Sequence, residues 1–583
     1  MVAMFNRDRR TRLRGSVIGM KLVVIGGVTG GMSTAARLRR LDPKAEIVVF
    51  ERGENVSFSN CALPYYLGGV VEESSKLILM TPASLKRQHD LDVRVRHEVV
   101  AINRDRKTVT VRNLETDETF EEPYDKLMLA PGASPIMPKS IAGIDRGNVF
   151  SVRNVGDVVA IKQAVDQIER VAVVGGGFIG IEVAENLRNA GKQVALIEGT
   201  DQILAPFDYD MVQILHKELD DNGVELHLSA TVTAIDDTGV TVSTAAGEEL
   251  IPAQAVIMAI GVAPETKLAV DAGLEIGEAR GIRVNNNYQT SDPDIYAVGD
   301  AVETYDALAH RWGRLALAGP AQRQARAAAD HMCGMPVSNK GYIGSSCLRV
   351  FGRNAACTGL SEKAAKAAGY SYDSVLIFPS DKVSVLPGSH YLAFKLVFEV
   401  PTGKILGAQA IGAGEADKRV DVIATMITMG GTIADLKDLE LCYAPLFSTA
   451  KDVVNFAALV AENVLTGRMP QVHVSEVRGL VESGAYIVDV REEGEFAFGH
   501  LKGAHNVPLS QLRSRMDEIP RDVPVYLHCR SSQRSYYALC ALRGNGWTNV
   551  VNISGSFLGI SLYEYFNDKA QGREPIVTRY NCN

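Results

Sequence analysis

The stretch Lys21-Leu22-Val23-Val24-Ile25-Gly26-Gly27-Val28-Thr29-Gly30-Gly31 decides the fold, because an apolar run leads directly into a glycine-rich turn and a helical pattern. Residues 170–180 repeat this design as Arg170-Val171-Ala172-Val173-Val174-Gly175-Gly176-Gly177-Phe178-Ile179-Gly180. After each turn a second apolar strand ends in an acid, Glu51 or Glu198. Glycines let the backbone approach a pyrophosphate, the helix N-terminus presents N–H groups, and the acid accepts a ribose hydroxyl. Two complete units predict two dinucleotide-binding domains.

Bulk properties exclude several function classes. A chain of 583 residues holds about three or four domains. A net charge of −8, with no dense basic face beyond the N-terminus, argues against a nucleic-acid partner. The eight cysteines are scattered without disulfide or zinc spacing, which favours a reducing cytoplasm and no metal site. No apolar run is long enough to span a bilayer, so we expect a cytoplasmic protein without a membrane partner.

The order of the segments predicts the domain boundaries. Residues 1–19 are rich in arginine, lack the apolar stretch of a secretory signal and are expected to be a leader outside the fold. The first nucleotide unit spans 20–138 and resumes at 263–338, and the second, 139–262, is inserted between them. A strand at 295–298 ends in Gly299-Asp300 ahead of a helix, which places a carboxylate where a flavin would be met. This order resembles the two-domain flavoprotein disulfide reductases.

That resemblance implies the remaining architecture. Residues 339–465 look like the interface domain of this superfamily, which makes the protein a homodimer. Residues 466–471 are expected to be a linker, and 472–583 form a further α/β unit. The predicted fold class is therefore α/β, with two Rossmann-like domains for FAD and NAD, an α+β dimerisation domain and a C-terminal α/β domain.

Cys61, in Ser57-Phe58-Ser59-Asn60-Cys61, is the first candidate reactive centre. It precedes a helical run at 62–67, and a helix N-terminus lowers a cysteine pKa and makes the thiol nucleophilic. The alternative is a buried structural cysteine, against which its polar neighbours argue. The next cysteine is Cys333, so Cys61 is expected to cycle through a mixed disulfide with an external thiol or through a sulfenic acid.

Residues 57–65 resemble the Ser-Phe-x-x-Cys site of coenzyme A-disulfide reductases. The resemblance implies FAD, a nicotinamide cofactor and a single cysteine that holds coenzyme A as a mixed disulfide. It implies that coenzyme A is bound by Ser33, Arg37, Arg40, Ser57, Phe58 and Asn60, although Arg37 and Arg40 could be only a solvated helix face. It also implies that Tyr443 reaches Cys61 of the partner subunit. A second family tyrosine is absent from residues 383–388, which favours a smaller sulfur leaving group.

The glycine turns and the resemblance together give the expected cofactor contacts. For FAD they are Gly26, Val28, Gly30, Gly31, Glu51, Asn60, Thr81, Val99, Ala130, Gly132, Asp300 and Ala318. For NAD they are Gly175, Gly177, Phe178, Ile179, Gly180, Glu182, Glu198 and Gly261. Val28 stands where a second glycine is usual, and Phe178 either covers the flavin or is a core aromatic. No arginine follows Glu198 directly, and its carboxylate repels a 2′-phosphate, so NADH is expected over NADPH.

Cys529 is the second candidate centre, because a strand ends at this cysteine and a short loop then enters a helix. Such a loop points N–H groups inward as an anion cradle, and Arg530 and Arg534 add positive charge. The segment resembles a rhodanese domain, with Asp489-Val490-Arg491-Glu492 as its N-terminal signature and Cys529 and Arg534 in the Cys-x4-Arg catalytic loop. The loop is one residue shorter than that of the related phosphatases, which favours sulfur over phosphate. The usual double glycine is replaced by Ser554-Gly555-Ser556.

The two centres predict an NADH-dependent persulfide and coenzyme A-disulfide reductase. Cys61 would attack a persulfide, polysulfide or disulfide sulfur and release sulfide or coenzyme A thiol, while Cys529 would handle sulfane sulfur. One alternative is an NADH oxidase or peroxidase whose Cys61 becomes a sulfenic acid. Another is a persulfide-sensing or binding protein without turnover.

Overall fold

The first glycine turn leaves the carboxyl edge of a five-stranded parallel sheet. The computed structural model describes residues 19–582, so the expected leader lies outside the described residues except for Gly19. The sheet has the order β18-β7-β1-β2-β3, and all its neighbours are parallel. Its strands are β1 (Lys21–Ile25), β2 (Glu46–Glu51), β3 (Asp92–Val95), β7 (Lys126–Leu129) and β18 (Ile295–Ala297). Because β18 comes from far along the chain, the chain returns to the first sheet after completing the second unit.

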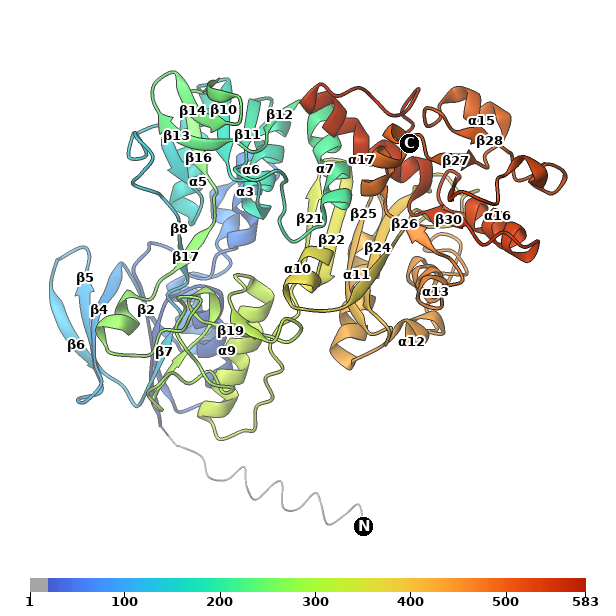
Figure 1. Cartoon of the computed structure of the whole chain (residues 1–583). Coiled ribbons are helices and arrows are strands. Elements are labelled where there is room, and N and C mark those ends of the chain that lie inside the picture. The colour runs from blue at the N-terminus through green and yellow to red at the C-terminus, as the bar shows by residue number, and fades with distance from the viewer. Residues whose placement is uncertain (1–18, 583) are drawn as a thin grey trace, which may run out of the picture.

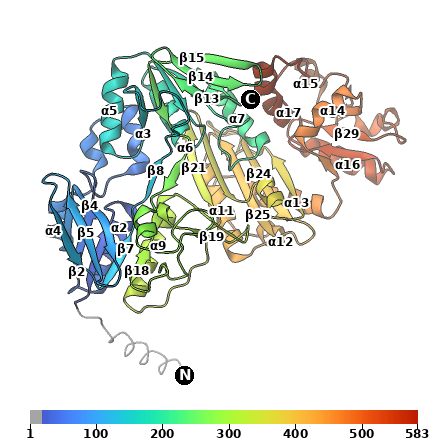
Figure 2. The same cartoon turned by 60° about the vertical axis from the view of Figure 1, so that its left-hand side comes forward.

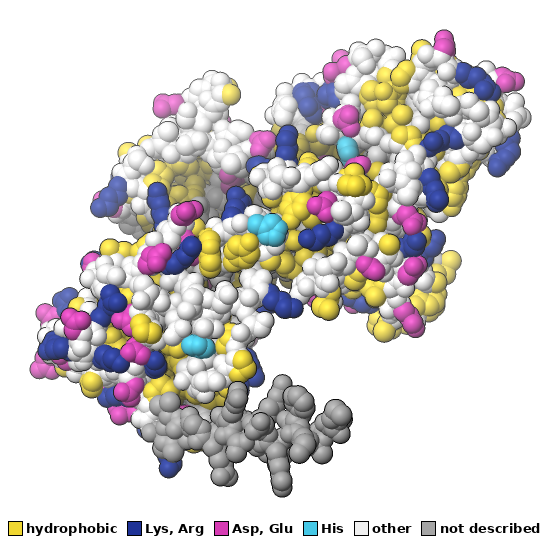
Figure 3. Space-filling model, turned by 60° about the horizontal axis from the view of Figure 1, so that its bottom comes forward, with side chains coloured by type: hydrophobic (Ala, Val, Ile, Leu, Met, Phe, Trp, Pro, Cys, Tyr) yellow, Lys and Arg dark blue, Asp and Glu magenta, His cyan; other side chains and the backbone are white. Residues whose placement is uncertain are grey.

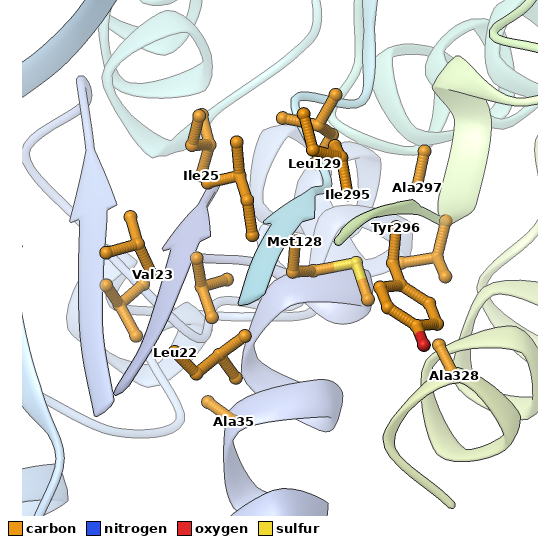
Figure 4. Close-up of a cluster of buried hydrophobic side chains, with 14 of the residues drawn as sticks. Leu22, Val23, Ile25, Ala35, Met128, Leu129, Ile295, Tyr296, Ala297 and Ala328 are labelled. Carbon is orange, nitrogen blue, oxygen red and sulfur yellow. The ribbon is translucent and has the colours of Figure 1, made fainter. Parts of the chain in front are cut away.

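The core of this first unit explains why its central strands β1 and β7 read as apolar runs (Figure 4), unlike the edge strand β3, which carries Asp92 and Arg94. Helices α2 (Thr29–Leu41) and α9 (Ala318–Met332) pack together beside the sheet. Leu22, Val23 and Met128 have no exposed surface. A parallel strand covered on both faces must be apolar at every position, so the sequence shows no alternation.

The second glycine turn repeats this arrangement in a sheet of order β12-β11-β10-β16-β9. Its strands are β9 (Val149–Ser151), β10 (Arg170–Val174), β11 (Gln193–Ile197), β12 (Val224–His227) and β16 (Ala255–Met258). Helix α5 (Val155–Asp166) follows β9, α6 (Phe178–Asn189) follows β10, and α7 (Tyr209–Asp221) follows β11. The antiparallel pair β8 (Ala133–Pro135) and β17 (Val262–Pro264) joins the two units. Two small antiparallel sheets complete them, β4 (His97–Asn103), β5 (Thr108–Asn113) and β6 (Thr119–Pro123), and β13 (Thr231–Ile235), β14 (Gly239–Thr244) and β15 (Gly247–Pro252).

The third unit is built on an antiparallel sheet of order β21-β22-β25-β24-β23. Its elements are β21 (Ser345–Val350), β22 (Arg353–Gly359), β23 (Tyr372–Ile377), β24 (Leu392–Glu399) and β25 (Ile405–Gly412), with helices α10 (Glu362–Ala367), α11 (Ala416–Met429), α12 (Ile433–Lys437) and α13 (Val453–Leu465). All eight residues of β25 are buried, as expected for a strand between two others with both faces covered.

The C-terminal unit is a second kind of α/β domain, with a parallel sheet of order β26-β30-β29-β27-β28. Its elements are β26 (Gln471–Val472), α14 (Val477–Glu482), β27 (Tyr486–Asp489), α15 (Glu493–Phe498), β28 (His505–Asn506), β29 (Val525–His528), α16 (Gln533–Gly544), β30 (Val550–Ile553) and α17 (Ser556–Gln571). The predicted fold class of two Rossmann-like domains, a dimerisation-type domain and a C-terminal α/β domain is confirmed.

Helix α17 fixes the C-terminal unit to the rest of the chain by packing along α7 (Figures 1 and 2). Leu558 and Leu562 of α17 join the hydrophobic cluster of the second nucleotide unit. The Tyr209 hydroxyl donates to Asn567 at 2.8 Å. The Lys569 ammonium lies 2.6 Å from a carboxylate oxygen of Asp220. Apolar burial and polar contacts together therefore hold the two units in one orientation.

One local expectation is wrong. Gly299 and Asp300 do not open a long helix; they lie in a single 3-10 turn, η3 (Gly299–Ala301). The chain then forms the hairpin β19 (Thr304–Asp306) and β20 (Arg311–Gly313), and α9 begins only at Ala318. The turn still places the Asp300 carboxylate directly after β18, which is the part of the expectation that concerns the site.

Surface charge and hydropathy agree with the bulk composition. Figure 3 shows basic and acidic side chains interspersed with apolar ones on the face that it displays. Within residues 19–582, no helix has both the length and the apolar character needed to cross a lipid bilayer.

The close approach in the second glycine turn gives a test of this fold. A Cβ on Gly180 would lie 1.9 Å from the Gly175 carbonyl oxygen, whereas nothing lies within 4 Å of a Cβ on Gly177. We expect Gly180→Ala to cost about 1–3 kcal/mol, because helix α6 must move away from the turn. Gly177→Ala should change stability by less than about 0.5 kcal/mol. Differential scanning calorimetry of both variants checks this, and equal melting temperatures would contradict it.

Candidate active site

Each glycine turn is tied to the acid that ends the following strand. The Gly27 N–H donates to Glu51 Oε2 at 2.7 Å, and the Gly176 N–H donates to Glu198 Oε2 at the same distance, 2.7 Å. The second oxygen of Glu198 accepts the Thr200 N–H at 2.8 Å. Both carboxylates are thereby held at the carboxyl edges of their sheets, beside the N-termini of α2 and α6, where a ribose next to a pyrophosphate would lie.

The unusual Val28 fits its position. It is the residue before α2, with an extended backbone at φ −112°. Its counterpart Gly177 has φ −79° and nothing within 4 Å of the place a Cβ would take. This position therefore accepts a side chain. Other positions of the turns exclude a side chain, most severely Gly31 and Gly180, where a Cβ would lie 1.9 Å from the carbonyl oxygen of Gly26 and of Gly175.

Most of the remaining residues expected at the first cofactor lie at the edge of the first sheet. A Cβ on Gly26 would lie 2.1 Å from the Ala130 carbonyl oxygen, and Gly30 faces Val298 and Ala130. Gly132 follows β7, Asp300 follows β18, and Ala318 is the first residue of α9. Thr81 caps α4 (Pro82–His89) by accepting the Ser84 N–H at 3.2 Å, and Val99 is buried in β4.

The residues expected at the second cofactor surround the second turn. Phe178 and Ile179 open α6, and Gly261 follows β16 with φ +118°. The Phe178 side chain is half-buried and packs against the hydrophobic cluster of this unit, and covering the flavin or serving as a core aromatic both stay predictions. Ile179 is 39% exposed and faces outward.

Cys61 is exposed and lies in the 3-10 turn η1 (Asn60–Ala62), ahead of the short helix α3 (Leu63–Leu67). The expected lowering of its pKa is not found. Desolvation by surrounding protein atoms raises the pKa of the Cys61 thiol, and the negative charges of Glu182 and Asp300 raise it further. The five-residue helix α3 is too short for its dipole to offset these effects. Asp300 comes from the first unit and Glu182 from the second, so Cys61 lies where the two nucleotide units meet.

Glu182 is itself perturbed, one turn into α6. Burial, with a smaller contribution from the charge of Glu185, raises the Glu182 pKa to about 7. Burial likewise raises the pKa of the Asp300 carboxyl. The Glu182 carboxyl therefore changes its charge near neutral pH, and that charge acts on the Cys61 thiol.

A cavity of about 360 Å³ opens beside the cysteine turn. It is lined by four residues expected from the sequence, Ser33, Arg37, Arg40 and Ser57, and by Met32, Ala36, Met80, Leu85, His89, Gln322 and Arg326. Arg37 is engaged, because its Nε lies 2.6 Å from Asp330 Oδ1. His89 and Arg326 were not anticipated, because they come from α4 and α9 and no local motif links them to Cys61.

Two other residues expected around coenzyme A lie elsewhere. Phe58 is 9% exposed and packs into the same hydrophobic cluster as Leu63 and Leu67. Asn60 is exposed next to Cys61 and does not line the cavity. Only part of the predicted set therefore converges on one space.

Tyr443 lies on an exposed apolar segment between α12 and α13. Its side chain is 51% exposed, Leu446 69% and Phe447 61%. Arg419 anchors this segment by donating to the Phe447 carbonyl at 3.2 Å. Neighbouring large apolar side chains of this exposure are typical of a surface that another chain covers.

Cys529 ends β29 at the bottom of a narrow loop and is 1% exposed. Its N–H donates to Ser556 Oγ at 3.2 Å, and Ser535 Oγ lies 3.8 Å from its sulfur. Among the described residues, the backbone N–H groups of Arg530, Ser531 and Ser532 have no hydrogen-bond acceptor. N–H groups left without an acceptor in the loop after this cysteine are what the predicted anion cradle requires.

Arg534 is fixed beside this loop by a partner that the sequence motif alone does not assign. Its two terminal nitrogens lie 2.6 and 2.8 Å from the carboxylate oxygens of Glu495. This bidentate pair raises the pKa of the Arg534 guanidinium and holds it in one orientation. Ser556, which replaces a usual glycine, adopts φ +50° and supplies the hydroxyl that binds the Cys529 N–H.

Comparisons with known proteins agree with this arrangement. Family models match residues 20–325 (pyridine nucleotide-disulphide oxidoreductase), 348–453 (its dimerisation domain) and 473–562 (rhodanese-like domain). A coenzyme A disulfide reductase of Staphylococcus epidermidis is 33% identical over 445 residues, 76% of this chain and 100% of that protein.

Two solved structures extend the likeness to the C-terminal domain. The reduced Bacillus anthracis protein CoADR-RHD is 42% identical, with a TM-score of 0.90, covering 94% of this chain and 99% of that one. An NAD-dependent persulfide reductase from A. fulgidus is 34% identical, with a TM-score of 0.87, covering 92% and 99%.

The charge of Glu182 gives a test of the cysteine environment. Because its carboxyl pKa is about 7, Glu182 is largely neutral below that pH and anionic above it, where it opposes ionisation of Cys61. We expect Glu182→Gln to raise the alkylation rate of Cys61 severalfold above neutrality and to change it little in mild acid. Mass spectrometry of the iodoacetamide-modified Cys61 peptide across pH measures this. The matched control is Glu225→Gln, an exposed acid of the same unit, and a shift equal to that of the control would refute the assignment.

Proposed function

The chain belongs to the pyridine nucleotide-disulphide oxidoreductase family and ends in a rhodanese-like domain, and we propose that it is an NADH-dependent reductase of persulfides and coenzyme A disulfides. The observation that carries the proposal is the position of Cys61, an exposed free cysteine whose thiol is affected by the charge of Asp300 from the first nucleotide unit and of Glu182 from the second. A single thiol in this place must take its second sulfur from a substrate.

Both nucleotide cradles fit their cofactors, FAD in the first unit and NAD(H) in the second. A Cβ at Gly26 or Gly31 would collide with backbone, so the close approach that a pyrophosphate needs is built into the turn. Gly26, Gly30, Gly31, Glu51 and Asp300 would hold FAD. When bound, FAD supplies the two-electron exchange between the nicotinamide and the sulfur centre.

The second cradle would hold the nicotinamide nucleotide through Gly175, Gly177, Gly180 and Glu198. The Glu198 carboxylate is fixed by the Gly176 and Thr200 N–H groups. A fixed anion accepts a ribose hydroxyl and repels a 2′-phosphate. This supports NADH as the preferred donor.

Cys61 is the proposed nucleophile. Its thiolate attacks one sulfur of a persulfide or disulfide, a Cys61–S bond forms, and the substrate S–S bond breaks with its electron pair leaving on hydrosulfide or coenzyme A thiolate. Two electrons that originate from NADH then break the new S–S bond, which returns Cys61 to its thiol and releases the bound sulfur group as coenzyme A thiol or hydrosulfide. The Glu182 carboxyl has a pKa of about 7 and its charge acts on the Cys61 thiol, so we assign it as the proton acceptor for Cys61 and the proton donor to the leaving sulfur.

The cavity beside Cys61 is the proposed site for the nucleotide of coenzyme A. Arg40 and Arg326 are exposed on its walls, whereas Arg37 is paired with Asp330. Guanidinium groups suit phosphates, and Ser57 connects this space to the cysteine turn. Ser33, Arg40, Ser57, His89 and Arg326 are therefore the proposed contacts.

Residues 348–453 match the dimerisation domain of this family, which supports a homodimer. The exposed Leu446 and Phe447 support burial of the neighbouring segment against a second copy. We assign Tyr443 to this interface, where its phenol would reach Cys61 of the partner subunit and donate to a sulfur anion. We also propose the domain boundaries predicted from the sequence, with the FAD domain at 20–138 and 263–338, the NAD domain at 139–262, the dimerisation domain at 339–465 and the C-terminal domain at 472–583.

Cysteine substitutions separate the roles of the two centres. With coenzyme A persulfide and NADH under anaerobic conditions, Cys61→Ser should lower sulfide release by at least about a hundredfold. Cys529→Ser should leave this step largely intact and abolish sulfane transfer from other donors. The control is Cys540→Ser, another exposed cysteine. Sulfide release by Cys61→Ser at the unmutated rate contradicts the scheme, and fast NADH oxidation by oxygen alone would favour the oxidase alternative.

Cavity variants test the substrate. Arg326→Gln should raise the KM for coenzyme A disulfide about tenfold, because a charge-assisted phosphate contact is lost, and leave the KM for pantethine, which lacks the nucleotide, unchanged. Arg323→Gln, an exposed arginine on the same helix that does not line the cavity, is the matched control. Steady-state kinetics with coenzyme A disulfide and with pantethine measures these KM values. Equal KM changes for the two disulfides would argue against nucleotide binding in this cavity.

A further inference from the structure

Arg530, the residue after Cys529, reaches out of its own domain. Its guanidinium carbon lies 5.8 Å from the centre of the Tyr391 ring. Tyr391 belongs to the third unit and directly precedes β24. A guanidinium over an aromatic ring at this distance forms a cation–π pair. One side chain of the dimerisation domain thus touches the cysteine loop of the rhodanese-like domain.

The charge of Arg530 is left available. Its Nη1 atom is shielded from solvent and has no hydrogen-bond partner among residues 19–582. The neighbouring Arg534, in contrast, is neutralised by its bidentate pair with Glu495. The nearby Cys582 offers no counter-charge at neutral pH, because burial raises its thiol pKa to about 11. A shielded donor of this kind is costly unless a ligand satisfies it.

The backbone around Arg530 is already fixed, so Tyr391 acts on the side chain. The carbonyl oxygens of Cys529 and Arg530 accept the N–H groups of Phe557 and Leu558, each at 3.0 Å. These bonds anchor the loop to the start of α17. The orientation of the Arg530 guanidinium is then set by the contacts of its side chain. In the described structure it contacts the Tyr391 ring, which is itself 44% exposed.

We propose that Tyr391 is a positioning residue for the rhodanese-like centre, holding Arg530 so that its charge binds the anionic part of a small sulfane-sulfur donor. The proposal rests on the assigned role of Cys529 as sulfane carrier. The site for the sulfur donor is then formed by residues of two domains. It is complete only while α17 packs against the rest of the chain. The donor class is a sulfane sulfur attached to an oxyanion.

Inorganic thiosulfate is the probe, and the chemistry balances without a redox partner. The Cys529 thiolate attacks the outer sulfur of thiosulfate, the new S–S bond forms, and the old S–S bond breaks with its electron pair leaving on sulfite. Cyanide then attacks the outer sulfur of the Cys529 persulfide, and thiocyanate leaves while the thiolate is restored.

The test compares Tyr391→Ala, Tyr391→Phe, Arg530→Ala and the double variant Tyr391→Ala/Arg530→Ala in the full-length holoenzyme. Tyr391→Ala should raise the KM for thiosulfate about fivefold to tenfold with kcat within about twofold, because the cation–π contact that orients Arg530 is lost. Tyr391→Phe, which keeps the ring face, should behave like the unmutated protein. The double variant should be no worse than Arg530→Ala alone. Melting temperature and bound flavin confirm that each variant is folded.

Each other outcome has a definite meaning. An unchanged KM in Tyr391→Ala overturns the proposal, as does a Phe variant as poor as the Ala variant, since the ring face would then not be responsible. A further loss in the double variant overturns it as well, because Tyr391 would be acting other than through Arg530. Absence of thiocyanate formation by the unmutated protein would overturn the role of Cys529 and this proposal together.

Discussion

Backbone packed against backbone in two strand-to-helix turns is the constraint on which the rest of the molecule depends. At Gly31 and at Gly180 a Cβ would lie 1.9 Å from a carbonyl oxygen of the preceding turn. Helices α2 and α6 can begin where they do only because those positions lack a side chain. That start aims their N-terminal N–H groups past the sheet edge and brings Gly27 and Gly176 within 2.7 Å of Glu51 and Glu198.

The same constraint places Cys61. One acid that acts on its sulfur, Glu182, lies on the helix that opens at the second turn, and the other, Asp300, follows the edge strand of the first sheet. The cysteine turn therefore lies between two cradles whose spacing is set by the β8–β17 connection. A thiol at this junction can receive electrons that enter the protein at the nucleotide site of one unit and pass through the nucleotide site of the other.

Docking of the C-terminal domain is equally firm and constrains how sulfur can travel. Gly555 and Gly559 lie so close to Phe378 that a Cβ would come within 3.3–3.4 Å of its ring. Leu558 and Leu562 of the same helix are buried in the hydrophobic cluster of the second nucleotide unit, and Lys569 pairs with Asp220 of that unit at 2.6 Å. A domain that swings between sites would have to expose this apolar surface and does not fit these contacts. A sulfur carried by a small substrate does.

Features that depend on interactions between residues close in sequence could be predicted, and features that depend on packing between distant segments could not. The strands at 21–25 and 170–174 have the predicted bounds, because a short apolar run before a glycine turn is a local signal. The prediction of a helix directly after Asp300 is wrong, because the β19–β20 hairpin that follows depends on tertiary packing. His89, Arg326 and Tyr391 carry no motif of their own. They join their sites only through folding, from helices or a loop remote in sequence.

The electrostatics of Cys61 is the most informative departure, because it changes how reactivity must arise. A thiol whose pKa is raised is mostly protonated near neutrality, and the thiolate is the reactive form. Such a cysteine is protected from chance oxidation although it is exposed. Its reactivity must then come from holding the substrate sulfur against it, and orientation of this kind can supply several kcal/mol, about 7 or more in well-placed cases. Ser57 lines the cavity that we propose for the coenzyme A nucleotide, and it lies four residues before Cys61 in the sequence. On that proposal, phosphate contacts made at the cavity would position the substrate sulfur at Cys61, and selectivity and reactivity at this centre would have the same physical origin.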